Sequence, residues 1–181
     1  MEEQKNITEN FRKNFLKSFD PPIQRPSFIE YFLIIAHDLS LRSDDPNIRH
    51  GAVITTIDSK NIIGTGYNGT IQGSDLNKIP INIRDKKRKY MIHAEENAIL
   101  NCMANPKTIG GAILYVTGLP CVNCLQRIIN FNIKEIYYAD RVGTITEDEE
   151  TTFMRQNILD MSDIKMHKVD TNTFWLKKNY V

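Results

Sequence analysis

Long apolar stretches are missing from this sequence of 181 residues. The first twenty residues are polar and mixed in charge, and no apolar run there leads to a small-residue cleavage site. The longest apolar runs, residues 31–36 and 112–116, are much shorter than the roughly 20 residues that span a bilayer. We therefore expect neither a secretory signal nor a membrane segment.

Cysteine is also scarce, and neither sign of charge is in excess. The three cysteines are an odd number, and Cys121 and Cys124 lie three positions apart, which is typical of thiols with a metal or redox task in a reducing compartment. The net charge of +1 provides no overall field for a polyanion such as duplex nucleic acid, although a local pocket could still be basic. These features predict a soluble, cytoplasmic domain and do not exclude a small anionic substrate.

The length fits a single domain with an appended terminus. Prolines at positions 21, 22 and 26 interrupt the first segment, so residues 1–25 are predicted to form an N-terminal arm. Residues 26–181 would then form one domain. Its first helix should begin at Ser27, because Glu30 three residues later completes a capping box.

Hydrophobic periodicity sets the remaining elements. It predicts helices over residues 27–41, 95–104, 121–131 and 147–161. Apolar, β-branched runs predict strands at residues 51–57, 61–67, 112–117 and 134–139, and an edge strand at 164–169. The first two strands form a predicted antiparallel hairpin, whereas the later alternation of strand and helix predicts parallel pairing. Between these halves, residues 69–89 form a long excursion without periodicity, which is typical of functional loops.

Two short segments contain the residues of a metal centre. One is His93-Ala94-Glu95, and the other contains Cys121 and Cys124 directly after Pro120. Zinc binds imidazole nitrogen and thiolate sulfur with tetrahedral geometry, and catalytic sites leave the fourth position to water. The segments supply three such ligands, and no other histidine lies at ligand spacing. The sequence therefore predicts one catalytic zinc ion per subunit.

The predicted helix starts support this interpretation. A helix N-terminus carries partial positive charge and free N–H groups, which favour the thiolate forms of Cys121 and Cys124. Glu95 lies two residues beyond His93, so its carboxylate could face the water and shuttle protons. Taken alone, His93 could be an ordinary histidine, and Cys-x-x-Cys could be a redox dithiol or half of a structural zinc site.

Together, the two segments match the His-x-Glu…Pro-Cys-x-x-Cys signature, and the chain resembles the zinc-dependent nucleoside and nucleobase deaminases. The resemblance is closest to the deoxycytidylate deaminase branch. It rests on residues 93–99, on the run 114–121, on the Gly-x-Gly-Tyr-Asn-Gly run at 64–69 and on the corner at 42–54. The similarity covers about residues 28–140, which we take as the catalytic core.

The resemblance implies an α/β fold, a three-layer α/β/α cytidine-deaminase-like sandwich around a central five-stranded mixed sheet. It also implies a homo-oligomer. On the matching positions, it implies that Asn68 binds the sugar or base, that Asn47 and Arg42 lie near the sugar and phosphate, and that Ala94 belongs to the substrate-binding set. An amide suits hydroxyls and a guanidinium suits phosphate, but Asn68 before Gly69 could equally serve a tight turn, and Arg42 a solvated helix end.

The excursion at residues 69–89 has the length that is typical of the deoxycytidylate branch. In regulated members it shapes the nucleotide pocket and a triphosphate effector site, so dCTP and dTTP are candidate effectors. A basic cluster there could face such a phosphate or form a solvated face; its members are Arg84, Lys86, Lys87, Arg88 and Lys89. The chain departs from the branch at residues 70–73 and at His50, which bears on effector regulation more than on catalysis.

We therefore predict a zinc-dependent hydrolytic deaminase that converts dCMP to dUMP and ammonia and so feeds thymidylate synthesis. Zinc would be bound by His93, Cys121 and Cys124, and Glu95 would move the protons. Two alternatives are open at this point. One is a deaminase of cytidine, CMP, dCTP or tRNA adenosine, and the other is a deaminase-fold protein that binds a nucleotide or a partner without turnover.

Overall fold

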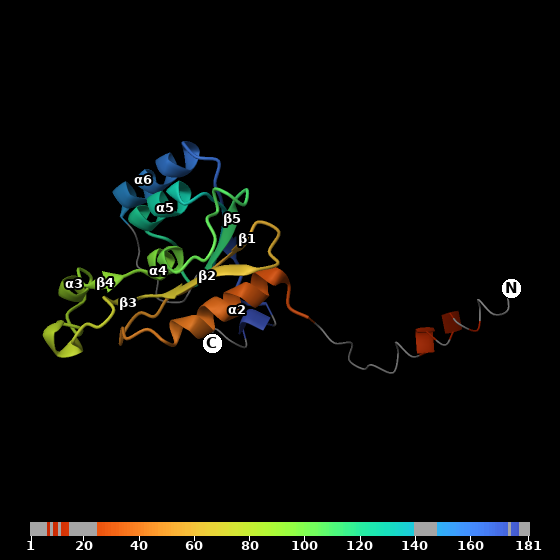
Figure 1. Ribbon diagram of the computed structural model, residues 1–181, viewed down its shortest axis with the longest axis horizontal. Coiled ribbons are helices and arrows are strands. Elements are labelled where there is room, and N and C mark those ends of the chain that lie inside the picture. The colour runs from red at the N-terminus through yellow and green to blue at the C-terminus, as the bar shows by residue number, and fades with distance from the viewer. Residues whose placement is uncertain are drawn as a thin grey trace.

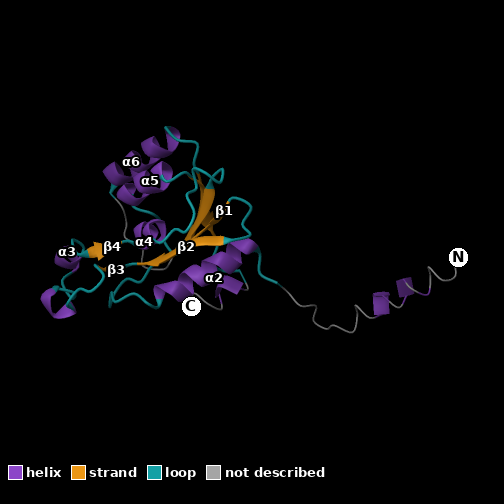
Figure 2. Cartoon of the chain, in the orientation of Figure 1, coloured by secondary structure: helices purple, strands orange, loops and turns teal. Residues whose placement is uncertain are grey.

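A mixed five-stranded sheet forms the middle layer of the molecule, with helices on both faces (Figures 1 and 2). The computed structural model describes residues 7, 9, 10, 12–14, 25–139, 148–173 and 175–177. The predicted α/β/α sandwich is confirmed, whereas most of the predicted N-terminal arm lies outside the described residues. Within those residues, no helix combines the length and the apolar character needed to cross a membrane.

The strands of the sheet follow the order β2-β1-β5-β6-β7. Their bounds are β1 (Gly51–Thr56), β2 (Ile62–Tyr67), β5 (Ala112–Val116), β6 (Ile133–Ala139) and β7 (Lys165–Val169). Strand β1 is antiparallel to β2 and β5, while the pairs β5–β6 and β6–β7 are parallel. The hairpin, the parallel pairing and the edge position of the last strand agree with the sequence-based prediction.

Helix α2 (Phe28–Ser40) covers one face of the sheet (Figure 1). Its N-terminus has the predicted capping box, because the Ser27 hydroxyl accepts from the Glu30 N–H while the Glu30 carboxylate accepts from the Ser27 N–H. The buried stripe of α2 packs on the side chains that β1 and β5 direct to this face. Leu176, near the C-terminus, is fully buried in the same cluster.

Helices α4 (Ala94–Leu100), α5 (Val122–Asn130) and α6 (Glu149–Asp160) lie on the other side of the sheet. Helix α4 ends four residues before the predicted end at residue 104. The chain leaves the helix because the N–H of Met103 donates to the Ile63 carbonyl, and the side chain of Asn101 donates to the Thr65 carbonyl, both on β2. Cys102, which was expected inside the helix, therefore lies just after it.

The excursion after β2 is a loop whose two ends are paired. It contains β3 (Gly69–Thr70), the 3₁₀ helix η1 (Leu76–Lys78), α3 (Arg84–Lys87) and β4 (Met91–Ile92). Strands β3 and β4 are antiparallel, with Gly69 opposite Ile92. This pairing closes the loop one residue before His93, and Figure 1 shows the closed loop projecting from the sheet at the left.

Gly66 sets the distance between β2 and α4. A Cβ atom at this position would overlap the backbone nitrogen of Ala98 and the carbonyl oxygen of Ala94, and a Cβ atom on Gly64 would lie 2.6 Å from the Ala98 oxygen. Because these are backbone atoms of one helix, the helix could relieve the overlap only by moving away from the sheet. The two glycines therefore hold α4, and with it His93, close to β2.

We expect Gly66→Ala to lower the free energy of unfolding by about 1–3 kcal/mol, the usual cost of overpacking. Urea unfolding would measure it. Gly69→Ala is the matched control: Gly69 is also buried, but its Cβ would make only ordinary van der Waals contacts, the nearest at 3.5 Å from Asp44 Oδ1, so it should lose less stability than Gly66→Ala. Equal losses in the two variants would show that Gly66 does not act as a spacer.

Candidate metal and active site

The three predicted metal ligands lie at the starts of two helices. His93 is the N-cap of α4, Cys121 is the N-cap of α5, and Cys124 lies in the first turn of α5. The two helices contact each other on the same face of the sheet. Ligands that are 28 residues or more apart in sequence are thereby brought together.

The ligand atoms have the spacing that zinc requires. The Nδ1 atom of His93 lies 3.6 Å from Cys121 Sγ and 3.3 Å from Cys124 Sγ, and the three atoms lie within 4.8 Å of one another. Zinc bonds of about 2.0–2.1 Å to nitrogen and 2.3 Å to sulfur, at tetrahedral angles, separate N and S by about 3.5 Å. Across the described residues, no fourth histidine, cysteine or carboxylate joins this group. The donor set therefore fits a zinc ion with one coordination position left over.

Neighbouring groups in the protein favour the thiolate form of Cys121. Hydrogen bonds from the Cys124 thiol and the His93 ring lower the pKa of Cys121 from 9.0 to about 3, against the opposing effect of burial. The proton that the two sulfurs share raises the pKa of Cys124, and the hydrogen bond to Cys121 raises the pKa of His93. A metal ion would displace these protons, so metal binding should release protons and weaken as the pH falls.

Glu95 is a buried carboxyl beside the three ligands, in the first turn of α4. Only 6% of the residue is exposed, and burial raises the pKa of its carboxyl above 4.5, although the neighbouring His93 partly opposes the shift. Its side chain also shares a hydrogen bond with Cys124. A carboxyl with a raised pKa can take up and return a proton closer to neutral pH, as acid–base catalysis requires.

Asn68 directly follows β2 and anchors the segment before β1. Its side-chain oxygen accepts from the His50 N–H at 2.6 Å, and its side-chain nitrogen donates to the Ile48 carbonyl at 2.9 Å. The residue is only 6% exposed. Asn68 thus links the end of β2 to the segment before β1, and neither Asn68 nor Gly69 has the positive φ of the tight turn that the sequence left open. Its amide retains one N–H and one lone pair that could meet a substrate.

Of the other predicted substrate residues, one lies beside the metal ligands and two lie on an exposed segment. Arg42 and Asn47 are exposed on the segment between α2 and β1, and no contact among the described residues joins either side chain to the metal ligands. Ala94 is buried at the start of α4, between the metal ligand His93 and Glu95. The roles of Arg42, Asn47 and Ala94 stay predictions.

His50 and Thr117 form a link that the sequence did not predict. The ring Nδ1 of His50 lies 3.1 Å from the hydroxyl oxygen of Thr117, and the same hydroxyl accepts from the Gly51 N–H. Thr117 directly follows β5 and precedes the segment that leads to Cys121. The link therefore holds the start of β1 against the approach to the metal ligands.

Two consecutive aspartates between α2 and β1 hold both ends of the excursion. Asp44 accepts from the Thr70 hydroxyl at 2.8 Å, and Asp45 accepts from the Lys87 ammonium at 2.6 Å. Both members of the Lys87–Asp45 pair are buried, with side chains 3% and 6% exposed. The same Asp45 oxygen accepts from the N–H of Asn47 at 2.8 Å. The pair thus connects the excursion to the segment that contains Asn47.

The predicted basic cluster is therefore wrong for one of its five members. Lys87 faces neither a phosphate nor solvent, because its charge is neutralised by Asp45 inside the protein. The remaining members are exposed, and they are Arg84, Lys86, Arg88 and Lys89. A sequence alone gives no sign that one lysine in a charged run is buried, since the partner lies 42 residues away.

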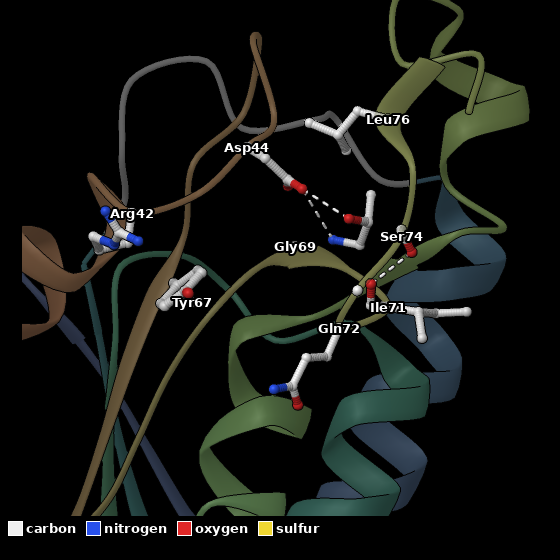
Figure 3. A pocket seen from close by; sticks show the side chains of 10 residues that line it. Arg42, Asp44, Tyr67, Gly69, Ile71, Gln72, Ser74 and Leu76 are labelled. Atoms are coloured by element: carbon white, nitrogen blue, oxygen red, sulfur yellow. Dashed lines mark hydrogen bonds between the residues drawn. The ribbon is translucent and has the colours of Figure 1, made fainter. Parts of the chain in front are cut away.

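A cavity of about 270 Å³ lies between the excursion and the segment after α2 (Figure 3). Arg42, Asp44 and Tyr67 line it together with residues 69–74 and Leu76. Figure 3 shows the Asp44 carboxylate reaching across to the excursion, where one oxygen is held by Thr70. The other oxygen is buried without a hydrogen-bond partner among the described residues, so it can accept from a ligand.

The amino-acid sequence matches known proteins. The sequence model of the cytidine and deoxycytidylate deaminase zinc-binding region matches residues 26–140. ComE operon protein 2 of Bacillus subtilis is 35% identical over 152 residues, which cover 82% of this chain and 74% of that protein. Deoxycytidylate deaminase of Pongo abelii is 36% identical and is covered to 78%, with 77% of this chain.

Solved structures with low sequence identity share the fold. The dCMP deaminase of cyanophage S-TIM5 in complex with dCMP and dUMP has a TM-score of 0.58 at 21% identity, covering 81% of this chain and 99% of that one. RibD of Acinetobacter baumannii, form 1, has a TM-score of 0.54 at 20% identity, covering 84% of this chain but 37% of that one.

We expect Lys87→Met to lower the free energy of unfolding by about 3–5 kcal/mol at neutral pH, because it leaves the Asp45 charge buried and unpaired. Burial alone would raise the pKa of Asp45, but Lys87 and the N–H groups of Asn47 and Ile48 hold it below 3.8. The ion pair therefore stabilises the protein fully above that pH and is lost as the pH falls further.

Urea unfolding at pH 7 and at about pH 3 would test this. The difference in free energy of unfolding between the unchanged protein and Lys87→Met should be smaller in acid, because Asp45 is protonated there. Lys86→Met is the control, since Lys86 is the exposed neighbour in the same helix and should change stability by less than about 0.5 kcal/mol. If the loss of stability caused by Lys87→Met did not change with pH, its ion pair with Asp45 would not be the cause of that loss.

Proposed function

Because the chain belongs to the family of the cytidine and deoxycytidylate deaminase zinc-binding region, we propose that it catalyses the hydrolysis of dCMP, in which dCMP and water give dUMP and ammonia. The observation that carries this proposal is the buried Glu95 beside a three-ligand cluster of His93, Cys121 and Cys124. Relatives that are 35–39% identical and span much of the chain include several deoxycytidylate deaminases, which favours the deoxynucleotide over other substrates.

In this proposal His93, Cys121 and Cys124 hold one zinc ion. Bound zinc supplies Lewis acidity, which makes a water molecule acidic enough to react near neutral pH. The three protein ligands fix where that chemistry takes place, directly beside the Glu95 carboxyl. The two helix N-termini support the negative charge of the sulfur ligands.

Glu95 moves the protons of the reaction. Its carboxylate accepts a proton from the attacking water and delivers it to N3 of the cytosine ring, as oxygen adds to C4. It then takes the second proton from the new hydroxyl group on C4 and gives it to the amino group, so that the C4 carbonyl forms as the C4–N bond breaks and ammonia leaves. The raised pKa that burial gives this carboxyl suits both steps, because the group must hold a proton briefly and then release it.

The substrate would be held by residues around the end of β2. We propose that Asn68 uses its remaining N–H and lone pair on the sugar or base, and that Ala94 lines the pocket beside Glu95. Asn47 and Arg42 would lie toward the sugar and phosphate. The location of Asn68 at the end of the strand on which α4 packs supports its place near the metal ligands.

The cavity beside the excursion is a candidate effector site for dCTP or dTTP. Among its lining residues, Asp44 has an unpaired oxygen that offers an acceptor for a base or sugar donor. The β3–β4 pair joins the cavity wall to the residue before His93, which provides a route from effector to metal ligands. Assembly as a homo-oligomer and a cytoplasmic location also stay predictions.

The substrate is tested by ammonia release from dCMP, dCTP, CMP, cytidine, deoxycytidine and a tRNA anticodon stem-loop, with and without dCTP and dTTP as effectors. We expect dCMP to have the highest kcat/KM, and the effectors to shift the dCMP saturation curve. Equal turnover of deoxycytidine and dCMP would exclude a phosphate-binding site. Absence of turnover on every substrate by a protein that contains stoichiometric zinc would favour a nucleotide-binding protein without catalysis.

We expect Glu95→Gln to lower kcat for dCMP by about 10²–10⁴-fold, the usual contribution of a general acid–base group, while zinc content is unchanged. Glu96→Gln is the matched control, because the neighbouring Glu96 is half-buried and pairs with Arg127 on α5, 3.4 Å away. It should retain nearly full activity. Steady-state assays and metal analysis would measure both, and an active Glu95→Gln variant would exclude the proton shuttle.

A further inference from the structure

Arg155 is a buried cation on a helix that the family match does not include. It lies in α6, whereas the family model ends at residue 140. The residue is only 6% exposed, and it is the one buried residue of an otherwise largely polar helix. Arginine is almost never buried without a strong partner, so its location requires a reason.

One partner is the backbone carbonyl of Pro120, which accepts from an Arg155 Nη atom at 3.0 Å. Pro120 is buried and directly precedes Cys121. Its carbonyl cannot belong to the hydrogen-bond ladder of α5, because that ladder begins at the Cys121 carbonyl, which accepts from the Leu125 N–H. A buried carbonyl outside a ladder must find another donor. The Arg155 guanidinium provides it.

This bond fixes the peptide unit that enters the metal cluster. The Pro120 carbonyl and the Cys121 nitrogen belong to one planar peptide, so holding the carbonyl also fixes the direction in which Cys121 leaves it. As the N-cap of α5, Cys121 has an extended backbone, and its sulfur accepts from the Cys124 N–H within the same turn. The orientation of this one peptide therefore affects the relative placement of both sulfurs.

We propose that Arg155 is a positioning residue of the metal centre: through the Pro120 carbonyl it holds the Cys-x-x-Cys turn in the geometry that retains zinc. This proposal rests on the proposed metal site. Helix α6 would thus help to retain the metal, although no contact among the described residues joins it to the metal ligands themselves.

The test is the rate of zinc release from the full-length, zinc-loaded protein into a chromogenic chelator. We expect Arg155→Met to release zinc about 10-fold faster or more, within the about 10–100-fold range typical of groups that orient metal ligands. Arg155→Lys keeps the charge but has a shorter reach and no planar fork, so its rate should lie between those of Arg155→Met and the unchanged protein. Gln156→Met is the control, since Gln156 is the exposed neighbour of Arg155 on α6 and its side chain donates to Asp160 of the same helix, and its release rate should be unchanged.

Thermal unfolding of the zinc-loaded and zinc-free forms separates positioning from packing. If Arg155 positions the turn, Arg155→Met should reduce the stabilisation that zinc adds. If it only fills space, both forms should lose the same stability and zinc release should stay unchanged, which would overturn the proposal.

If Arg155→Met does not fold, Arg155→Lys alone tests the proposal. Faster zinc release than from the unchanged protein would support it, and an unchanged release rate would contradict it. If the unchanged protein binds no zinc at all, the proposed function fails instead, which is a different result from equal release rates.

Discussion

The close approach of α4 to β2 is the constraint on which the site depends. Two glycines, Gly64 and Gly66, leave no side chain between the strand and the helix backbone, so the helix rests directly on the sheet. The Asn97 side chain then donates to the Tyr67 carbonyl at the end of the same strand. His93 and Glu95 are consequently placed by backbone packing, and α5 has to supply only the two sulfurs at the correct distance.

A second constraint is the pairing of charges inside the loops beside the site. The segment after α2 has two adjacent aspartates, one for each end of the excursion, and only the second is paired with a buried cation. Breaking such a buried pair is costly because the remaining charge cannot be solvated. The excursion is therefore a fixed wall of the cavity, and an effector bound there would contact a part of the chain that leads through β4 to His93.

The sequence predicted the parts of this architecture that depend on local pattern. The capping box at Ser27, the hairpin and the parallel strands all follow from spacing and turn residues, and the metal cluster follows from two short segments at predicted helix starts. It did not predict the early end of α4 or the burial of Lys87. Both depend on partners that are distant in sequence, namely the carbonyls of β2 and the carboxylate of Asp45.

The described residues after position 147 contribute to both faces of the sheet. On one face, Arg155 of α6 meets the carbonyl that precedes the metal ligands; on the other, Leu176 is buried against α2 and the central strands. Strand β7 meanwhile extends the sheet beside β6. A motif search finds the ligands and the acid–base group, because their chemistry fixes residue type and spacing. The groups that hold those residues in place have no such fixed spacing, so tertiary contacts are needed to find them.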